Sequence, residues 1–307
     1  MSEILLPDVV NEEEYQQLPI AEDLWKSMVK PDALQPAHKS LQASWDEPVY
    51  SFKYEQLLAK QTTPAESARL RAVASENASS WLNATPVPSL GLKLDDTSLR
   101  ICCGLRLGSQ ICHSYTCTCG NLVDPTGRHG LSCAFAKGRA SRHFQANDLI
   151  KRALASADVP AVLEPLGLSN NNNERPDGLS LFPWREGKNI VWDFTCCDTL
   201  AWSHVSSTSK EAGLAAENAE KKKLAKYEYL RNGYILTPIA VETLGSWGQM
   251  GLKFIKDLGS RIADRTGDMR STSYLFQSLS VAVQRGNAAS VMGTIPPTKK
   301  LDELYLL

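Results

Sequence analysis

Two short segments that each carry an aspartate constrain the fold of this chain most strongly. Residues 174–178, with the sequence ERPDG, and residues 190–195, with the sequence IVWDFT, are each predicted to form a short strand, and the second is rich in the β-branched and aromatic residues typical of one. Residues 183–187 contain a proline and a glycine and are the predicted hairpin turn. Fifteen residues separate Asp177 from Asp193, so a hairpin would bring both carboxylates to one edge of a sheet.

The segments around this hairpin predict an α/β domain. A helix at 138–157 and a strand at 161–164 are expected before the hairpin. A helix at 209–231, a strand at 234–242 and two helices at 249–264 and 271–285 are expected after it. The asparagines at 170–173 predict a loop. Pro238 cannot donate to a central ladder, so the strand that contains it is expected at an edge or at a bulge.

The first helix of this domain combines an apolar stripe with basic residues. Phe144, Ile150 and Leu154 are expected on the stripe, and Arg139 and Arg142 elsewhere on the helix. A basic helix of this kind suits a partner with a phosphate backbone.

The rest of the chain divides into a leader, a linker and a tail. Prolines interrupt residues 1–62, which predicts an irregular leader, and residues 1–60 carry five lysines against eleven acids, a net charge of −6. A Thr-Pro-x-Glu sequence at 63–66 predicts a helix that runs to about residue 82, inside a helical linker over 63–111. A tail is expected at 293–307.

Composition favours a soluble intracellular protein. No apolar run approaches the roughly 18 residues that cross a bilayer, and no basic segment followed by a long apolar run marks a secretory signal. Eight cysteines in a reducing compartment are expected as thiols or metal ligands rather than as disulfides.

The paired aspartates predict a site for a divalent cation. Magnesium, or manganese in its place, takes hard oxygen ligands, and Glu164 on the preceding strand could join Asp177 and Asp193. Lys223 and Lys226 lie three residues apart on one helix face and are candidates to stabilise charge at the site. The alternatives are an ordinary Pro-Asp-Gly turn and a solvated lysine face.

A second candidate metal site lies in a loop-like region rich in cysteine, glycine and histidine at 112–136. Its predicted ligands for structural zinc are Cys117, Cys119, His129 and Cys133. The tight spacing of the first pair leaves Cys103, Cys112 and His113 open as substitutes. The alternative is a cluster of buried thiols with a histidine whose hydrogen bonds are satisfied.

These residues together carry a resemblance to a known family. The Arg175-Pro176-Asp177 stretch, then Asp193, then a helix with lysines that includes Lys226-Tyr227, resembles the restriction-like endonuclease domain of R2-type non-LTR retrotransposons, a member of the PD-(D/E)xK nuclease superfamily. The resemblance spans about residues 65 to 295. The reverse transcriptase motifs of those elements are absent from this sequence.

The resemblance implies roles for individual residues. It implies metal binding by Asp177 and Asp193, and Thr195 stands where the superfamily usually has a lysine. The retrotransposon enzymes take that lysine from the following helix, which matches Lys223 or Lys226 here. Further likenesses are the Arg-His pair at 142–143, the Val-Glu-Thr sequence at 241–243 and a Cys-Cys-His-Cys knuckle before the nuclease domain.

The implied fold is a restriction-endonuclease-like core over 137–292, a central mixed sheet flanked by helices, preceded by a zinc knuckle and a helical leader. The implied function is metal-dependent hydrolysis of DNA, with RNA or an RNA–DNA hybrid as other possible partners, no membrane, and a nuclear location as an option. Residues expected to contact the nucleic acid are Arg139, Arg142, His143 and Lys222. The alternatives are a nucleic-acid-binding module that no longer cleaves and a protein-binding α/β domain.

Overall fold

The computed structural model describes residues 12–37, 40–136, 138–168 and 175–306, and the chain divides into two compact units, Met1–Thr62 and Thr63–Leu307. The asparagines at 170–173 and Glu174 lie outside the described residues. Among the residues that are described, no helix has the length and apolar composition needed to cross a membrane.

The first unit is helical, and the prediction of an irregular leader is wrong. It contains α1 (Glu12–Met28) and α2 (Gln42–Ala59), each with a proline inside the helix. Trp25, Val29 and Val49 form a small buried cluster between the two helices, and the Trp25 indole donates a hydrogen bond of 2.8 Å to a backbone carbonyl of α2. This packing stabilises the helices against the loss of a hydrogen bond at each proline.

The second unit begins with a capped helix, α3 (Pro64–Ala74). As predicted, the Thr63 hydroxyl accepts a hydrogen bond from the backbone N–H of Glu66, at 3.2 Å. The helix ends earlier than predicted because Ser75 is extended and Asn77 has a φ of 61°. Two short 3-10 helices, η1 (Ser80–Asn83) and η2 (Pro88–Leu90), then lead to α4 (Asp96–Leu107).

A small cysteine-rich lobe follows α4. It contains a two-stranded antiparallel sheet, β1 (Tyr115–Thr116) and β2 (Leu122–Val123), and the short helix α5 (His129–Ser132). The chain end packs on this lobe through α11 (Leu301–Leu304) and the buried Tyr305. Residues 293–306 are therefore part of the lobe rather than the expected tail.

A four-stranded mixed sheet forms the centre of the second unit. Its order is β3 (Ala161–Leu163), β4 (Gly178–Ser180), β5 (Asn189–Cys197) and β6 (Tyr234–Glu242). β5 is antiparallel to β4 and parallel to β6. The predicted hairpin turn is confirmed, with positive φ at Glu186 and Gly187, and β6 is an edge strand, as Pro238 predicts.

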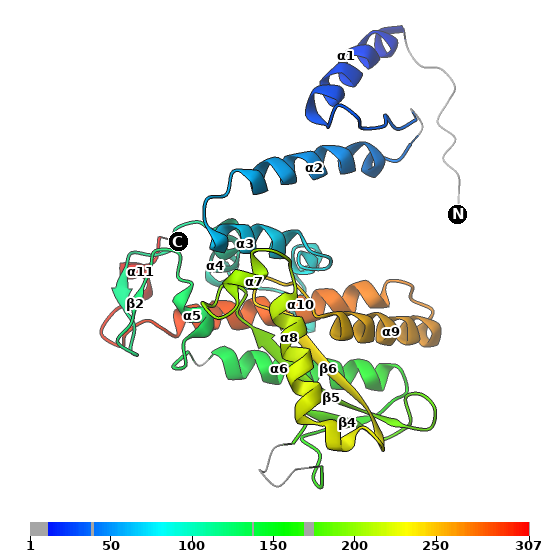
Figure 1. The fold of residues 1–307 in the computed structure, drawn as a ribbon, viewed down its shortest axis with the longest axis vertical. Helices are drawn as coiled ribbons and strands as arrows, with labels where there is room; N and C mark the ends of the chain where they lie inside the picture. Colours follow the sequence, from blue (N-terminus) through cyan, green and yellow to red (C-terminus); the bar gives the residue numbers. More distant parts are fainter. Residues whose placement is uncertain (1–11, 38–39, 137, 169–174, 307) are drawn as a thin grey trace. The chain divides into compact units, whose positions relative to one another are not determined.

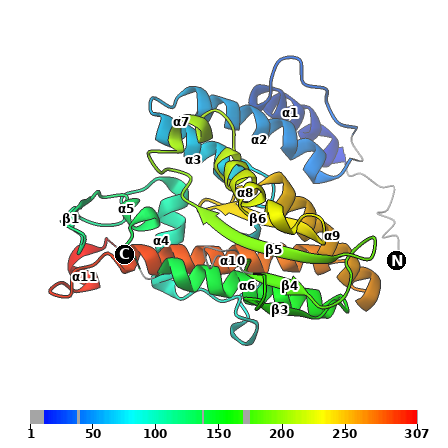
Figure 2. The ribbon, with the colours of Figure 1, turned by 60° about the horizontal axis from the view of Figure 1, so that its bottom comes forward.

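Helices cover both faces of this sheet (Figures 1 and 2). The main core packs one face against α6 (Gly138–Ser156), α9 (Gln249–Thr266) and α10 (Ser271–Met292), which is longer than predicted. The other face lies against α8 (Leu214–Lys226) and η3 (Glu228–Leu230). α8 is shorter than the predicted helix because Gly213, with a φ of 86°, separates it from the short helix α7 (Val205–Thr208).

Candidate functional site

Asp177 lies at the end of the hairpin, directly before β4. β5 extends beyond this short strand, so the backbone N–H of Phe194 has no ladder partner on that side. Oδ2 of Asp177 accepts a hydrogen bond from this N–H at 2.7 Å and another from Nδ2 of Asn147 at 3.0 Å. Nε2 of His143 lies 2.9 Å from the same oxygen. β5 and α6 therefore fix the orientation of this carboxylate together.

Asp193 is in the middle of β5, and its side chain is on the α8 side of the sheet. Alternation along the strand explains this placement, because the neighbouring Trp192 and Phe194 are buried in the main core. The Asp193 side chain is only 6% exposed; its Oδ2 accepts a hydrogen bond of 2.8 Å from Tyr227, and its Oδ1 lies 2.7 Å from Nζ of Lys223. This Oδ1 has no hydrogen bond of good angular geometry from any described residue, so the Lys223 contact is an ion pair with spare acceptor capacity.

The two aspartates differ in their pKa shifts. Burial, followed by the negative charge of Asp177, raises the pKa of Asp193, although Lys223 acts in the opposite direction. Burial also acts to raise the pKa of Asp177, but hydrogen bonds from His143, Phe194 and Asn147 outweigh it and the pKa is lowered. The hydrogen bond with Asp177 in turn raises the pKa of His143. Paired carboxyls whose pKa values move apart are typical of functional sites.

The structure brings Asp177, Asp193, His143 and Lys223 together, but not every residue predicted with them. Glu164 follows β3 with a φ of 48°, and its carboxylate is 67% exposed and pairs with Arg175. We therefore correct its assignment as a third metal ligand at this site. Lys226 lies over the Tyr227 ring, 5.1 Å from its centroid, so Lys223 is the lysine that pairs with Asp193.

Two residues on α6 exchange their expected places. Phe144, expected on the apolar stripe, is 66% exposed. Arg142, expected to contact nucleic acid, is 2% exposed and donates a hydrogen bond to Oδ1 of Asn287 on α10. Arg139 remains exposed on the same helix. The structure therefore gives Arg142 a packing role.

Two cavities lie near the candidate site, although neither Asp177 nor Asp193 borders them directly. The larger, of about 520 Å³, lies between α6, β5 and α8 and is bordered by His143 and Lys223. The second, of about 300 Å³, is bordered by Lys222 and by the loop before α7. Arg139 borders both cavities.

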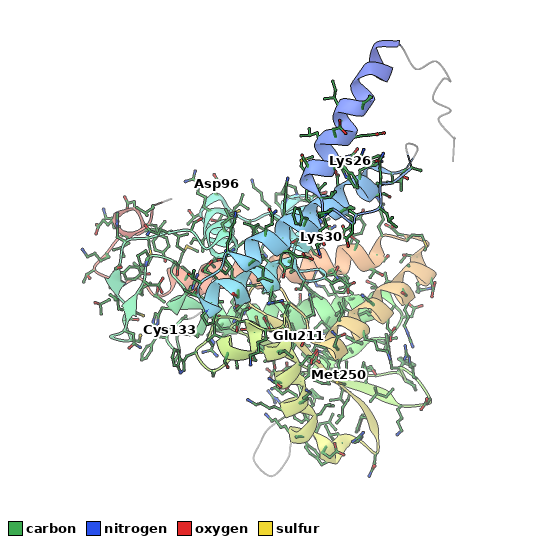
Figure 3. The ribbon with its side chains drawn as sticks, turned by 45° about the horizontal axis from the view of Figure 1, so that its top comes forward. Lys26, Lys30, Asp96, Cys133, Glu211 and Met250 are labelled. Atoms are coloured by element: carbon green, nitrogen blue, oxygen red, sulfur yellow. The ribbon has the colours of Figure 1, made fainter. Side chains whose placement is uncertain are left out.

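The cysteine-rich lobe brings its four predicted ligands together. The candidate donor atoms of Cys117, Cys119, His129 and Cys133 all lie within 4.8 Å of one another. The sulfurs of Cys117 and Cys133 are 3.8 Å apart, close to the roughly 3.8 Å that two thiolates bound 2.3 Å from a tetrahedral zinc would show. Figure 3 labels Cys133, at the end of α5. The group could hold a metal ion, and it is the only such group of three or more cysteine, histidine or acidic residues among those described.

Sequence reasoning missed two residues that orient the aspartates. Asn147 lies four residues after His143 and therefore on the same face of α6, which is the signal that could have identified it. The sequence predicts no role for Tyr227 beyond the motif, yet its hydroxyl donates a hydrogen bond to Asp193. A scan against known protein families and a search of curated proteins find no match for this chain.

Proposed function

We propose that this chain is a metal-dependent endonuclease that hydrolyses phosphodiester bonds in DNA, with a restriction-like core of the kind that its motifs resemble. The observation that carries the proposal is the arrangement of Asp177 before β4, Asp193 on the interior strand β5 and Lys223 on α8. Thr195 replaces the lysine expected on the strand, and the lysine that pairs with Asp193 comes from α8 instead. In the retrotransposon enzymes that the motifs resemble, this lysine likewise comes from the helix after the strand.

Asp177 and Asp193 would hold magnesium or manganese. Oδ1 of Asp193 supports this assignment because its contact with the Lys223 ammonium leaves acceptor capacity on the oxygen for a hard cation. Such an ion supplies charge for the phosphate oxygens and lowers the pKa of bound water. The Glu164 side chain, which pairs with Arg175, is not among the ligands proposed here.

The surrounding residues have separate tasks. Asn147 and His143 fix Asp177, and Tyr227 fixes Asp193, so that both carboxylates keep one orientation without a ligand. The Lys223 side chain is 28% exposed, and its ammonium group contacts Asp193. It would stabilise the negative charge that develops on the phosphate or orient the attacking water.

The second candidate function is a nucleic-acid-binding module that no longer cleaves. It is favoured by the pairing of each carboxylate with a cationic side chain, His143 or Lys223, which would have to move or share its partner when a metal ion binds. Both candidates predict DNA binding, and only the first predicts metal-dependent nicking.

The Cys117, Cys119, His129 and Cys133 group would hold a structural zinc ion. Its ligand types and the separation of its sulfurs suit tetrahedral zinc. The ion would tie α5 to the β1–β2 hairpin, which has only two residues in each strand and cannot be stable alone.

Nicking of supercoiled plasmid by the purified full chain, with magnesium or manganese, tests the proposed function. We expect nicking that requires the added metal and is lost in Asp177→Asn. Glu164→Gln is the matched control, because this nearby carboxylate is exposed and turned to Arg175, and it should retain the activity. Equal nicking by wild type and Asp177→Asn would refute the assignment.

A further inference from the structure

The two cavities near the candidate site adjoin each other. They share Arg139, Thr195 and Cys196 as bordering residues. The larger cavity reaches His143 and Lys223 at the aspartates, and the smaller one reaches the loop at 199–204 before α7. We name the combined feature the basic groove. It extends from the candidate site along the edge of β5.

The charges along the basic groove favour an anion. Its accessible cationic side chains are Arg139, Lys222 and Lys223, joined by His143 at the site, and the buried Arg142 lies behind them. The acidic side chain that borders it, Asp198, accepts hydrogen bonds from the backbone N–H of Leu200 at 3.1 Å and from the Thr243 hydroxyl at 3.3 Å. A chain of phosphates would match this distribution.

Two exposed aromatic side chains belong to segments that border the groove. Phe135 borders the larger cavity and is 63% exposed. Trp202 is 94% exposed and lies in the chain between Ala201 and His204, which both border the smaller cavity. Neither ring is covered by the fold. Aromatic rings combined with basic side chains are the means by which proteins bind single strands, because unpaired bases offer faces for stacking and a duplex hides them.

We propose that the basic groove binds a single-stranded segment of nucleic acid, with Phe135 and Trp202 stacked on unpaired bases and Arg139 and Lys222 on the phosphates. The preferred substrate of the candidate site is then DNA that is unpaired next to the cleaved bond, such as a flap or a bubble. This last step rests on the proposed endonuclease function, whereas binding of the strand does not.

Fluorescence anisotropy with a labelled mixed-sequence single strand and the matching duplex tests the proposal, using the full chain at fixed salt without magnesium. We expect the wild type to bind the single strand more tightly. Phe135→Ala and Trp202→Ala should each weaken that binding by about 5- to 160-fold, from the usual contribution of one stacked base, with a smaller effect on the duplex. Phe135→Tyr should restore it.

Phe144→Ala is the matched control, because Phe144 is equally exposed, at 66%, yet borders neither cavity. Equal loss in Phe144→Ala and Phe135→Ala would overturn the proposal, as would preference for the duplex or no binding of either nucleic acid. Single-strand binding with these variant effects in a protein that never nicks DNA would support the groove and refute only the endonuclease function.

Discussion

The Lys223–Asp193 ion pair predicts a large change in stability when its cation is removed. In Lys223→Met, a carboxylate that is 6% exposed loses its charged partner. Breaking a buried pair costs about 3–5 kcal/mol. Lys223 is 28% exposed and Asp193 can take up a proton instead, so we expect the free energy of unfolding to fall by about 1–3 kcal/mol at pH 7.

The pH dependence of this loss follows from the raised pKa of Asp193. A carboxyl whose pKa is higher in the fold than in the unfolded chain contributes stability at low pH, and this contribution is lost as the pH rises through the folded pKa. Lys223 limits that rise of the pKa. The deficit of Lys223→Met should therefore be small near pH 4, where an unfolded aspartate titrates, and reach its full size above the raised pKa.

Urea unfolding followed by tryptophan fluorescence measures the effect, since Trp192 is fully buried next to Asp193. Lys222→Met, one residue earlier on α8 and exposed, should change the free energy of unfolding by less than about 0.5 kcal/mol. The double variant Asp193→Asn/Lys223→Met should recover most of the loss because it has no buried charge. An equal effect of both lysine substitutions at pH 7, or no recovery in the double variant, would refute the reasoning.

Three further predictions concern neighbouring parts of the fold. His143→Gln should lower the free energy of unfolding by at most about 1 kcal/mol, because the side chain is half-exposed. Urea unfolding should show this difference from the wild type at pH 5–6.5. The difference should disappear as the pH rises through the raised pKa of His143. Metal analysis should find one zinc per chain that Cys117→Ser loses and Cys112→Ser keeps, and retention of zinc by the first variant would contradict the ligand assignment. Gly178→Ala should lower the free energy of unfolding in urea by about 1–3 kcal/mol, because a Cβ there would lie 2.0 Å from the buried Trp192 ring. An unchanged midpoint of the urea transition would contradict this prediction, because the ring would then move without loss of stability.

Much of the second unit could be predicted because its patterns are local. The strand periodicity around Asp193, the turn residues at 183–187 and the cap at Thr63 depend on neighbours in the chain. They placed β5, the hairpin turn, β6 and the start of α3 correctly, whereas β4 (Gly178–Ser180) begins only at the last residue of the strand expected at 174–178.

Features that depend on distant partners could not be predicted in this way. Arg142 lies four residues before Ala146, on the buried stripe of α6, and its burial is possible because Asn287 on α10 accepts its hydrogen bond. Hydrophobicity alone assigned that place to Phe144. The two-helix leader likewise depends on Trp25, which packs against residues of α2.

The central claim concerns the Asp177, Asp193 and Lys223 constellation, and one comparison tests it most directly. Metal-dependent nicking of supercoiled DNA is measured for the wild type and for Asp193→Asn, which keeps the shape of the side chain and removes a buried charge. The account predicts nicking by the wild type with magnesium or manganese and none above background by the variant. A cooperative urea unfolding transition shows that the variant is folded. Undiminished nicking by Asp193→Asn, or none by folded wild-type protein, would contradict it.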